Sequence, residues 1–196
     1  MRIGQEAGWN VALDSIKEGA FVVSGGAGKD ISFELELAKK KGCRMVLLDP
    51  SPTGANTVRT VLLPSNIFFE KKALSKHSGI IYMSKPQDMK EGSWRLCLDG
   101  KGDAMESTCL TDVIKEHDTA LIDLLKIDIE GYEYEVLKDA IEKKIPIQQI
   151  CVEIHEGESF GKTRFDRWAL ILRMILSGYR LIYQKGWDYT FLRSSA

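Results

Sequence analysis

The 196-residue sequence has no apolar run that approaches the roughly 18 residues a membrane-spanning helix needs. Its formal net charge of −1 gives no electrostatic attraction for nucleic acid or for an anionic membrane. The first ten residues contain no apolar core of a signal peptide, so we expect none. The four cysteines are scattered without a CxxC pair, which favours reduced thiols and a cytoplasmic location. We therefore expect neither nucleic acid nor a membrane as a partner.

Internal repeats and low-complexity tracts are also absent. With 44% hydrophobic and 28% charged residues, the composition is that of an ordinary soluble globular protein. We interpret residues 20–196 as a single domain and residues 1–19 as a short lead-in. The polar stretch at 84–107 predicts an irregular insert, either a lid over the substrate or a plain surface loop.

The first half of the chain contains a strand, a glycine turn, a helix, a second strand and an acid. An apolar run at 21–23 ends in the turn SGGAG (24–28), a helical pattern follows at 31–42, and a second apolar run at 45–48 ends at Asp49. Glycines let the backbone approach a ligand closely, and the helix N-terminus behind them favours anionic groups. This order is typical of a nucleotide-binding βαβ unit, and the position of Asp49 suits an acceptor for ribose hydroxyls.

The glycine turn has other interpretations. A P-loop requires GxxxxGK[ST], which fails because position 23 is Val and Asp30 follows Lys29. The dinucleotide fingerprint GxGxxG is incomplete, since its third glycine would fall on Ile31. The turn by itself leaves open a nicotinamide dinucleotide, S-adenosylmethionine, or a tight turn without a ligand.

Two acidic residues follow the most apolar segment of the chain. The predicted strand at 121–129 consists almost wholly of Leu and Ile, and Asp128 and Glu130 stand at its end. Alternation with period 2 places Lys126, Asp128 and Glu130 on one face. Unpaired carboxylates are costly in a buried strand, except at the carboxyl edge of a parallel sheet, which opens into a ligand crevice. The alternative is that both acids cap the following helix.

A second predicted strand, at 149–154, also ends in polar residues. Cys151, Glu153 and His155 share one of its faces. An unperturbed His titrates near neutral pH, so His155 is the first candidate for a general base, and Glu153 is placed to orient it or to bind the nucleophile. A structural hydrogen-bonding role for His155 is the alternative. The polar residues of both strand ends could also bind a divalent cation, but their spacing does not require one, and we predict no metal.

These segments together resemble the FkbM family of S-adenosylmethionine-dependent methyltransferases, over about residues 20–192. The segments that carry the resemblance are DLLKIDIEGYEYEVL (123–137), STCLTD (107–112), ALS (73–75), QICVEIH (149–155), SGGAGKDISFELE (24–36), LLDPSP (47–52) and SGYRLIY (177–183). The first of them is far more selective than a glycine turn alone. Ser24 departs from the pattern, because many methyltransferases of this fold have an acid there, and Asp30 is a nearby substitute.

The resemblance implies an α/β, Rossmann-like class I methyltransferase fold. Its features are a mostly parallel seven-stranded sheet, helices on both faces and a C-terminal antiparallel hairpin. The implied cofactor is S-adenosyl-L-methionine, and the implied reaction is O-methylation of a hydroxyl on a sugar or another small metabolite. Two other classes stay open at this point: a nicotinamide-dependent oxidoreductase, disfavoured by the missing third glycine, and a cofactor-binding module without catalysis.

The resemblance also assigns residues. Gly26 and Gly28 would approach the methionine part of the cofactor, Asp49 would accept from the ribose hydroxyls, and Ala73 would lie near the adenine. The predicted cofactor-binding residues are Ser24, Gly26, Gly28, Asp30, Ile31, Asp49, Pro50 and Ala73. The predicted catalytic residues are His155, Glu153, Asp128 and Glu130, of which the last two would hold substrate hydroxyls or the ammonium group of the cofactor.

Overall fold

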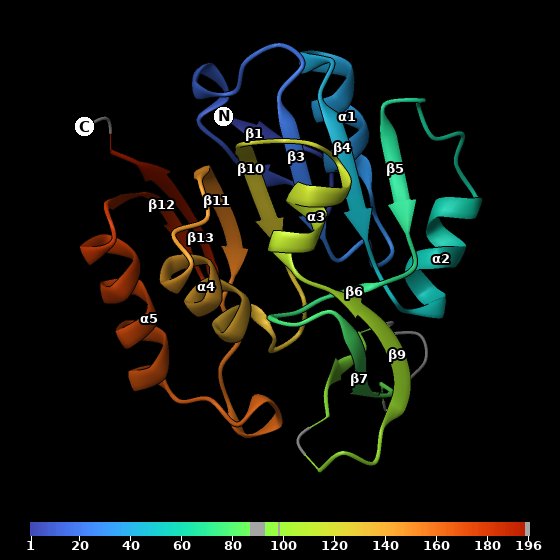
Figure 1. The fold of residues 1–196 in the computed structure, drawn as a ribbon, viewed down its shortest axis with the longest axis vertical. Coiled ribbons are helices and arrows are strands. Elements are labelled where there is room, and N and C mark those ends of the chain that lie inside the picture. Colours follow the sequence, from blue (N-terminus) through green and yellow to red (C-terminus); the bar gives the residue numbers. More distant parts are fainter. Residues whose placement is uncertain (87–92, 98, 195–196) are drawn as a thin grey trace.

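A seven-stranded sheet forms the centre of the protein, whose computed structural model describes residues 1–86, 93–97 and 99–194 (Figure 1). In spatial order its strands are β12 (Tyr179–Lys185), β13 (Asp188–Arg193), β11 (Ile147–Glu153), β10 (Ile122–Ile127), β3 (Phe21–Gly25), β4 (Arg44–Leu48) and β5 (Ile67–Glu70). β13 is antiparallel to both neighbours, whereas the pairs among β11, β10, β3, β4 and β5 are all parallel. The predicted mostly parallel sheet with a C-terminal antiparallel hairpin is therefore confirmed.

Helices cover both faces of this sheet (Figure 1). α3 (Leu110–Glu116), α4 (Glu133–Glu142) and α5 (Arg164–Leu176) contribute to the hydrophobic cluster on one face. α1 (Ser32–Lys41) and α2 (Pro52–Arg59) contribute to the cluster on the other face. The central strands β3 and β10 are buried between these layers, which explains why they are near-continuous apolar runs rather than alternating ones. No helix in the described part of the chain is long and apolar enough to cross a bilayer.

The lead-in at 1–19 packs against the same face as α1. It forms a small hairpin of β1 (Arg2–Ile3) and β2 (Trp9–Asn10), followed by a short 3₁₀ helix at Leu13–Ser15. Ile3, Trp9 and Ile16 are buried in one cluster with α1. The lead-in is thus part of the hydrophobic core of the domain.

A second, four-stranded sheet lies beyond the carboxyl ends of the parallel strands (Figure 1). Its strands, in spatial order, are β6 (Ala73–Leu74), β9 (Asp103–Thr108), β7 (Gly79–Ser84) and β8 (Arg95–Leu96). The prediction of an irregular insert at 84–107 was therefore wrong for β8 and β9, while its residues 87–92 and 98 lie outside the described residues. β9 is largely exposed, so it carries little hydrophobic signal and owes its strand form to pairing with β7 and β6.

Candidate active site

The polar strand ends meet at the carboxyl edge of the parallel sheet. β10 ends at Ile127, so Asp128 lies directly beyond it, and Glu130 adopts a left-handed backbone conformation with φ of 54°. The predicted strand at 121–129 was therefore too long, and the alternation does not extend to Glu130. Non-glycine residues seldom adopt this conformation, which is found preferentially at functional sites. The turn toward α4, rather than the pleat of a strand, sets the direction of Glu130.

The glycine turn after β3 is held close to β10. A Cβ on Gly26, whose φ is +91°, would lie 2.0 Å from the backbone oxygen of Asp128, so only glycine permits this approach. At Gly28, with φ of +52°, a Cβ would meet no protein atom within 4 Å. The first glycine is thus needed for packing, and the second leaves open space.

Asp49 fixes the turn from the end of β4. Its Oδ2 accepts hydrogen bonds from the backbone N–H groups of Ala27 (2.9 Å) and Gly28 (3.0 Å), and its Oδ1 accepts one from Ser51 (2.7 Å). A contact from Asp49 to ribose hydroxyls stays a prediction, and the structure adds that this carboxylate organises the turn itself.

A pocket of about 230 Å³ lies between the glycine turn, the second sheet and the acidic end of β10. The predicted cofactor-binding residues that line it are Gly26, Gly28, Asp30, Asp49, Pro50 and Ala73. Asp128 and Glu130, two of the predicted catalytic residues, line the same pocket. The structure therefore brings the two predicted groups of residues together.

Ser24 and Ile31 do not line this pocket. Ser24 is fully buried and its hydroxyl donates to Oε1 of Glu34 at 2.6 Å, because its side chain points toward α1. Nζ of Lys126 lies 3.6 Å from the same Glu34 oxygen. Ile31 is 3% exposed and packs in the core beside α1. Both residues therefore belong to the buried interior next to the glycine turn and not to the wall of the pocket.

Asp30 lines the pocket but its carboxylate already has partners. It accepts hydrogen bonds from the backbone N–H of Ala7 (2.9 Å) and of Ser32 (2.8 Å), and from the hydroxyl of Ser32 (2.9 Å). Burial opposes ionisation of Asp30, but these hydrogen bonds lower its pKa below the ordinary value. Asp30 therefore ties the lead-in to the start of α1.

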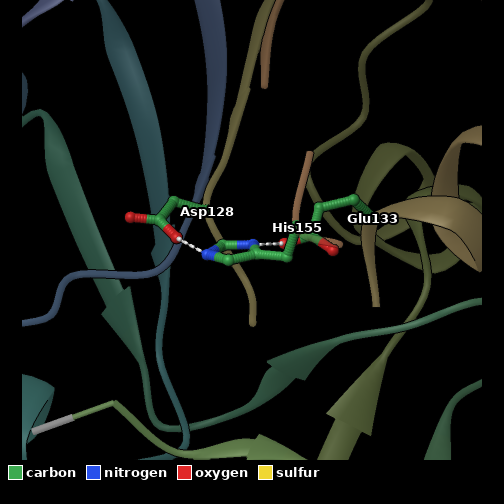
Figure 2. Close-up of side chains that lie close together, drawn as sticks. All are labelled: Asp128, Glu133 and His155. Carbon is green, nitrogen blue, oxygen red and sulfur yellow. Dashed lines mark hydrogen bonds and ion pairs between the residues drawn. The ribbon is translucent and has the colours of Figure 1, made fainter. Parts of the chain in front are cut away.

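His155 lies between the carboxylates of Asp128 and Glu133 (Figure 2). Its Nδ1 is 2.7 Å from Oε1 of Glu133. Its Nε2 is 3.8 Å from Asp128 Oδ1, 3.7 Å from Glu130 Oε2 and 3.9 Å from Glu153 Oε1. His155 and Glu153 do not line the pocket themselves, but they lie directly against Asp128 and Glu130, which do. We call these five residues the acidic cluster.

The acidic cluster changes the protonation of its members. Burial opposes the charged form of His155, but its hydrogen bond with Glu133 and the charges of Glu133, Asp128 and Glu130 together raise its pKa to about 9. Burial and the neighbouring charge of Asp128 raise the pKa of Glu153 to about 7. Burial also raises the pKa of Glu130. The premise that His155 has an ordinary pKa, on which its selection as the base depended, therefore does not hold in this arrangement.

Glu133 is the main residue of the site that sequence reasoning missed. It is fully buried at the start of α4, and its carboxylate also accepts from the backbone N–H of Gly131 (2.9 Å) and Ile129 (3.3 Å). In the sequence it is one more acid in the first turn of a helix, which predicts only a cap. Its contact with His155, 22 residues away, is visible only in three dimensions.

The second sheet supplies an apolar wall of the pocket that was also missed. Trp94, Met83 and Ala73 form a small buried cluster, with Tyr132 packed against it. All four line the pocket. A lone Trp within the polar segment at 84–107 was the available signal, because a Trp there suggests a buried contact.

The pocket fits S-adenosylmethionine in its chemical character. The open space at Gly28 admits the polar methionine chain of the cofactor close to the backbone, and Asp49 offers a carboxylate for the ribose hydroxyls. The wall formed by Ala73, Met83 and Trp94 is apolar, as the face of an adenine ring is. These features occupy one continuous cavity at the carboxyl edge of the sheet, where ligands of open α/β folds bind.

Comparison with solved structures defines the class of fold. The chain matches a fibrillarin pre-rRNA processing protein of Methanococcus jannaschii (12% identity, 94% of this chain and 70% of that chain, TM-score 0.51). It also matches precorrin-6y C5,15-methyltransferase from Geobacter metallireducens (11% identity, 94% and 85%, TM-score 0.50) and the METTL16 methyltransferase domain (14% identity, 91% and 61%, TM-score 0.50). The protein has the Rossmann-like fold of class I methyltransferases.

The sequence identifies the family within that class. The model of the methyltransferase FkbM domain matches residues 26–181, so the chain belongs to the FkbM methyltransferase family. Its cofactor is S-adenosyl-L-methionine. A comparison with curated protein sequences gave no significant match. The nicotinamide-dependent oxidoreductase is accordingly set aside, and the resemblance inferred from DLLKIDIEGYEYEVL is confirmed.

Proposed function

We propose that the protein is an O-methyltransferase that transfers a methyl group to a hydroxyl of a sugar or of another small, hydroxyl-rich metabolite. The observation that carries this proposal is the presence of two carboxylates, Asp128 and Glu130, in the wall of the cofactor pocket. Ionised carboxylates are acceptors only, so they suit a substrate that presents hydroxyl donors.

The surroundings of the acidic cluster support a compact, partly apolar acceptor. The rings of Phe160 and Trp187 lie 4.8 Å and 5.6 Å from the ring of His155, centroid to centroid. Trp187 is 37% exposed, and the guanidinium of Arg95 lies 5.5 Å from the ring of Phe160. Aromatic rings with a cation and several carboxylates at their edge match a molecule with apolar faces and hydroxyl edges.

The cofactor supplies a methyl group activated by its attachment to a sulfonium. The remaining requirements fall to the protein, which must hold the acceptor oxygen about 3 Å from the methyl carbon and in line with the bond that breaks. Asp128 and Glu130 accept hydrogen bonds from the acceptor hydroxyls and fix that position. The proton of the reacting hydroxyl passes to the acidic cluster, whose members are hydrogen-bonded or in contact with one another.

The direct test measures transfer of a labelled methyl group from S-adenosylmethionine to panels of monosaccharides, other small polyols, small amines and a transfer RNA. We expect transfer to hydroxyl compounds. Asp128→Asn removes a charge from the pocket wall and should lower kcat/KM by about 100-fold, within the range for loss of one catalytic interaction. Glu116→Gln, at the exposed end of α3, is the matched control and should leave the rate unchanged.

Binding and chemistry are separated by calorimetric titration with S-adenosylhomocysteine and, in parallel, NAD⁺. We expect binding of the former alone, with similar affinity in Asp128→Asn. Methylation of amines or RNA in place of hydroxyl compounds would refute the proposed acceptor class. Cofactor binding without transfer to any panel would support a module that binds the cofactor without catalysis.

A further inference from the structure

The acidic cluster has the composition of a metal centre. Carboxylate oxygens of Asp128, Glu130 and Glu153 lie 3.7 to 3.9 Å from Nε2 of His155. These distances are too long for hydrogen bonds. Two ligands that each lie about 2.1 Å from one ion are about 3.0 Å apart at an octahedral angle. Binding of an ion would therefore shorten each of these three nitrogen–oxygen distances by less than about 1 Å.

A ring nitrogen of a buried histidine, aimed into the cluster, is the second, independent observation. His155 is 5% exposed, and among the described residues its Nε2 has no hydrogen-bond partner within 3.5 Å. Its Nδ1 is occupied by Glu133, which is itself held by the N–H groups of Gly131 and Ile129. Such a carboxylate behind an imidazole fixes the ring and its tautomer, so that the other nitrogen presents its lone pair to an ion.

The charge of the cluster points to a cation. The four carboxylates Asp128, Glu130, Glu133 and Glu153 are joined at the edge by Asp188, which pairs with Glu153 across β11 and β13. Among the described residues, one Lys or Arg forms an ion pair with these four carboxylates. It is Arg95, whose Nε lies 3.9 Å from Oε2 of Glu130. Even with a proton on His155, the cluster holds more carboxylates than nearby positive charges. Partly buried carboxylates in such excess are costly, and a divalent ion offsets that cost.

We propose that the acidic cluster binds one divalent cation through Nε2 of His155 and one oxygen each of Asp128, Glu130 and Glu153, with Glu133 as the outer partner of His155. Three hard oxygens and one imidazole suit Mn²⁺ best among the common ions, with Mg²⁺ next. The ligands come from the ends of β10 and β11, so the fold places the site without a dedicated loop.

The role of the ion follows from its place against the pocket, and this part rests on the proposed function. Asp128 and Glu130 line the pocket, so remaining coordination positions face the acceptor. A hydroxyl oxygen bound there is oriented and made more acidic. Its proton passes to a free carboxylate oxygen of the cluster and then to water, the C–S bond to the methyl group breaks, and the C–O bond forms. The products are the methyl ether and neutral S-adenosylhomocysteine.

Metal binding is tested on the whole chain without any acceptor. After removal of metals with EDTA and dialysis, Mn²⁺ is titrated while free Mn²⁺ is followed by electron paramagnetic resonance. We expect one Mn²⁺ per chain with micromolar affinity and a ¹⁴N modulation from the imidazole in the pulsed spectrum. Glu153→Gln, at a half-exposed position, should weaken binding at least 10-fold, and Glu133→Gln should weaken it 10- to 100-fold. Glu116→Gln is the control and should bind Mn²⁺ normally.

The outcomes separate this proposal from the proposed function. His155→Gln should abolish the ¹⁴N signal, and circular dichroism checks that each variant is folded. Weak specific cation sites have dissociation constants of about 10⁻⁴–10⁻³ M. Absence of Mn²⁺ binding at 1 mM would therefore overturn the site even if S-adenosylhomocysteine still binds, and His155 would then hold a proton in place of an ion. Equal Mn²⁺ affinity in wild type and Glu153→Gln would also overturn it. Stoichiometric Mn²⁺ binding without methyl transfer would support the site and refute the proposed function.

Discussion

The two glycines of the turn after β3 should respond differently to the same added methyl group, Gly26 mainly through stability and Gly28 mainly through cofactor affinity. In Gly26→Ala the new Cβ would lie 2.0 Å from the backbone oxygen of Asp128, at a φ of +91°. A positive φ costs an L-residue about 1–2 kcal/mol. Separating the turn from β10 to relieve the overlap costs about 1–3 kcal/mol more. We therefore expect Gly26→Ala to lower the free energy of unfolding by about 2–5 kcal/mol.

Gly28→Ala should lower the free energy of unfolding only through its positive φ. Its φ is +52° and its Cβ would meet no protein atom within 4 Å, so the expected loss of stability is about 1–2 kcal/mol. Because Gly28 lines the pocket, the methyl group should instead obstruct the cofactor. We expect the affinity for S-adenosylhomocysteine to fall at least about tenfold, equivalent to about 1.4 kcal/mol.

Urea denaturation of both variants gives the stabilities, and calorimetric titration with S-adenosylhomocysteine gives the affinities. The reasoning fails if Gly26→Ala is no less stable than Gly28→Ala, because the close approach to Asp128 would then have no energetic consequence. It also fails if Gly28→Ala is folded and binds S-adenosylhomocysteine as tightly as the wild type, because the turn would then not form the cofactor site.

Three further substitutions test other parts of the structure. Asp49→Asn places amide donors against the backbone N–H groups of the turn and should cost about 1.5–3 kcal/mol and weaken S-adenosylhomocysteine binding; unchanged stability in urea would contradict it. Thr163→Ala removes the capping box of α5 and should cost about 1 kcal/mol in the same assay, with cofactor affinity unchanged. Ile150→Ala empties a 1%-exposed core position of β11 and should cost about 2–5 kcal/mol, whereas a loss below 1 kcal/mol would mean that β11 is not buried as described.

Most elements of the large sheet were predictable because their signals are local. The apolar runs that became β3, β4 and β10 alternate with helical patterns, which favours a parallel, buried sheet. The second sheet was not predictable in the same way. β9 is mostly exposed and gains its order from pairing with β6 and β7. A strand stabilised by its neighbours carries little of that information in its own residues.

The residues of the site likewise divide into those that the sequence indicated and those that depend on contacts between distant parts of the chain. Asp128, Glu130, Glu153 and His155 were identified because polar residues at the ends of apolar strands are unusual in sequence. The direction of Ser24 into the core, and the capture of Asp30 by the lead-in, depend on residues that are distant in the chain. Glu133 was missed because a helix cap and a partner of His155 look alike in sequence.

The sequence by itself determined the order of the strands and helices of the large sheet, the glycine turn, the acids at the strand ends and the resemblance to the family. These follow from periodicity and spacing, which act over a few residues, and from one selective motif at 123–137. Only the tertiary structure decided that five ionisable side chains, from two strand ends and the start of α4, lie close together, and that Trp94 and Tyr132 line the pocket. Electrostatic interaction and burial depend on distance in space, so the raised pKa of His155 arises only when the fold brings its carboxylates together.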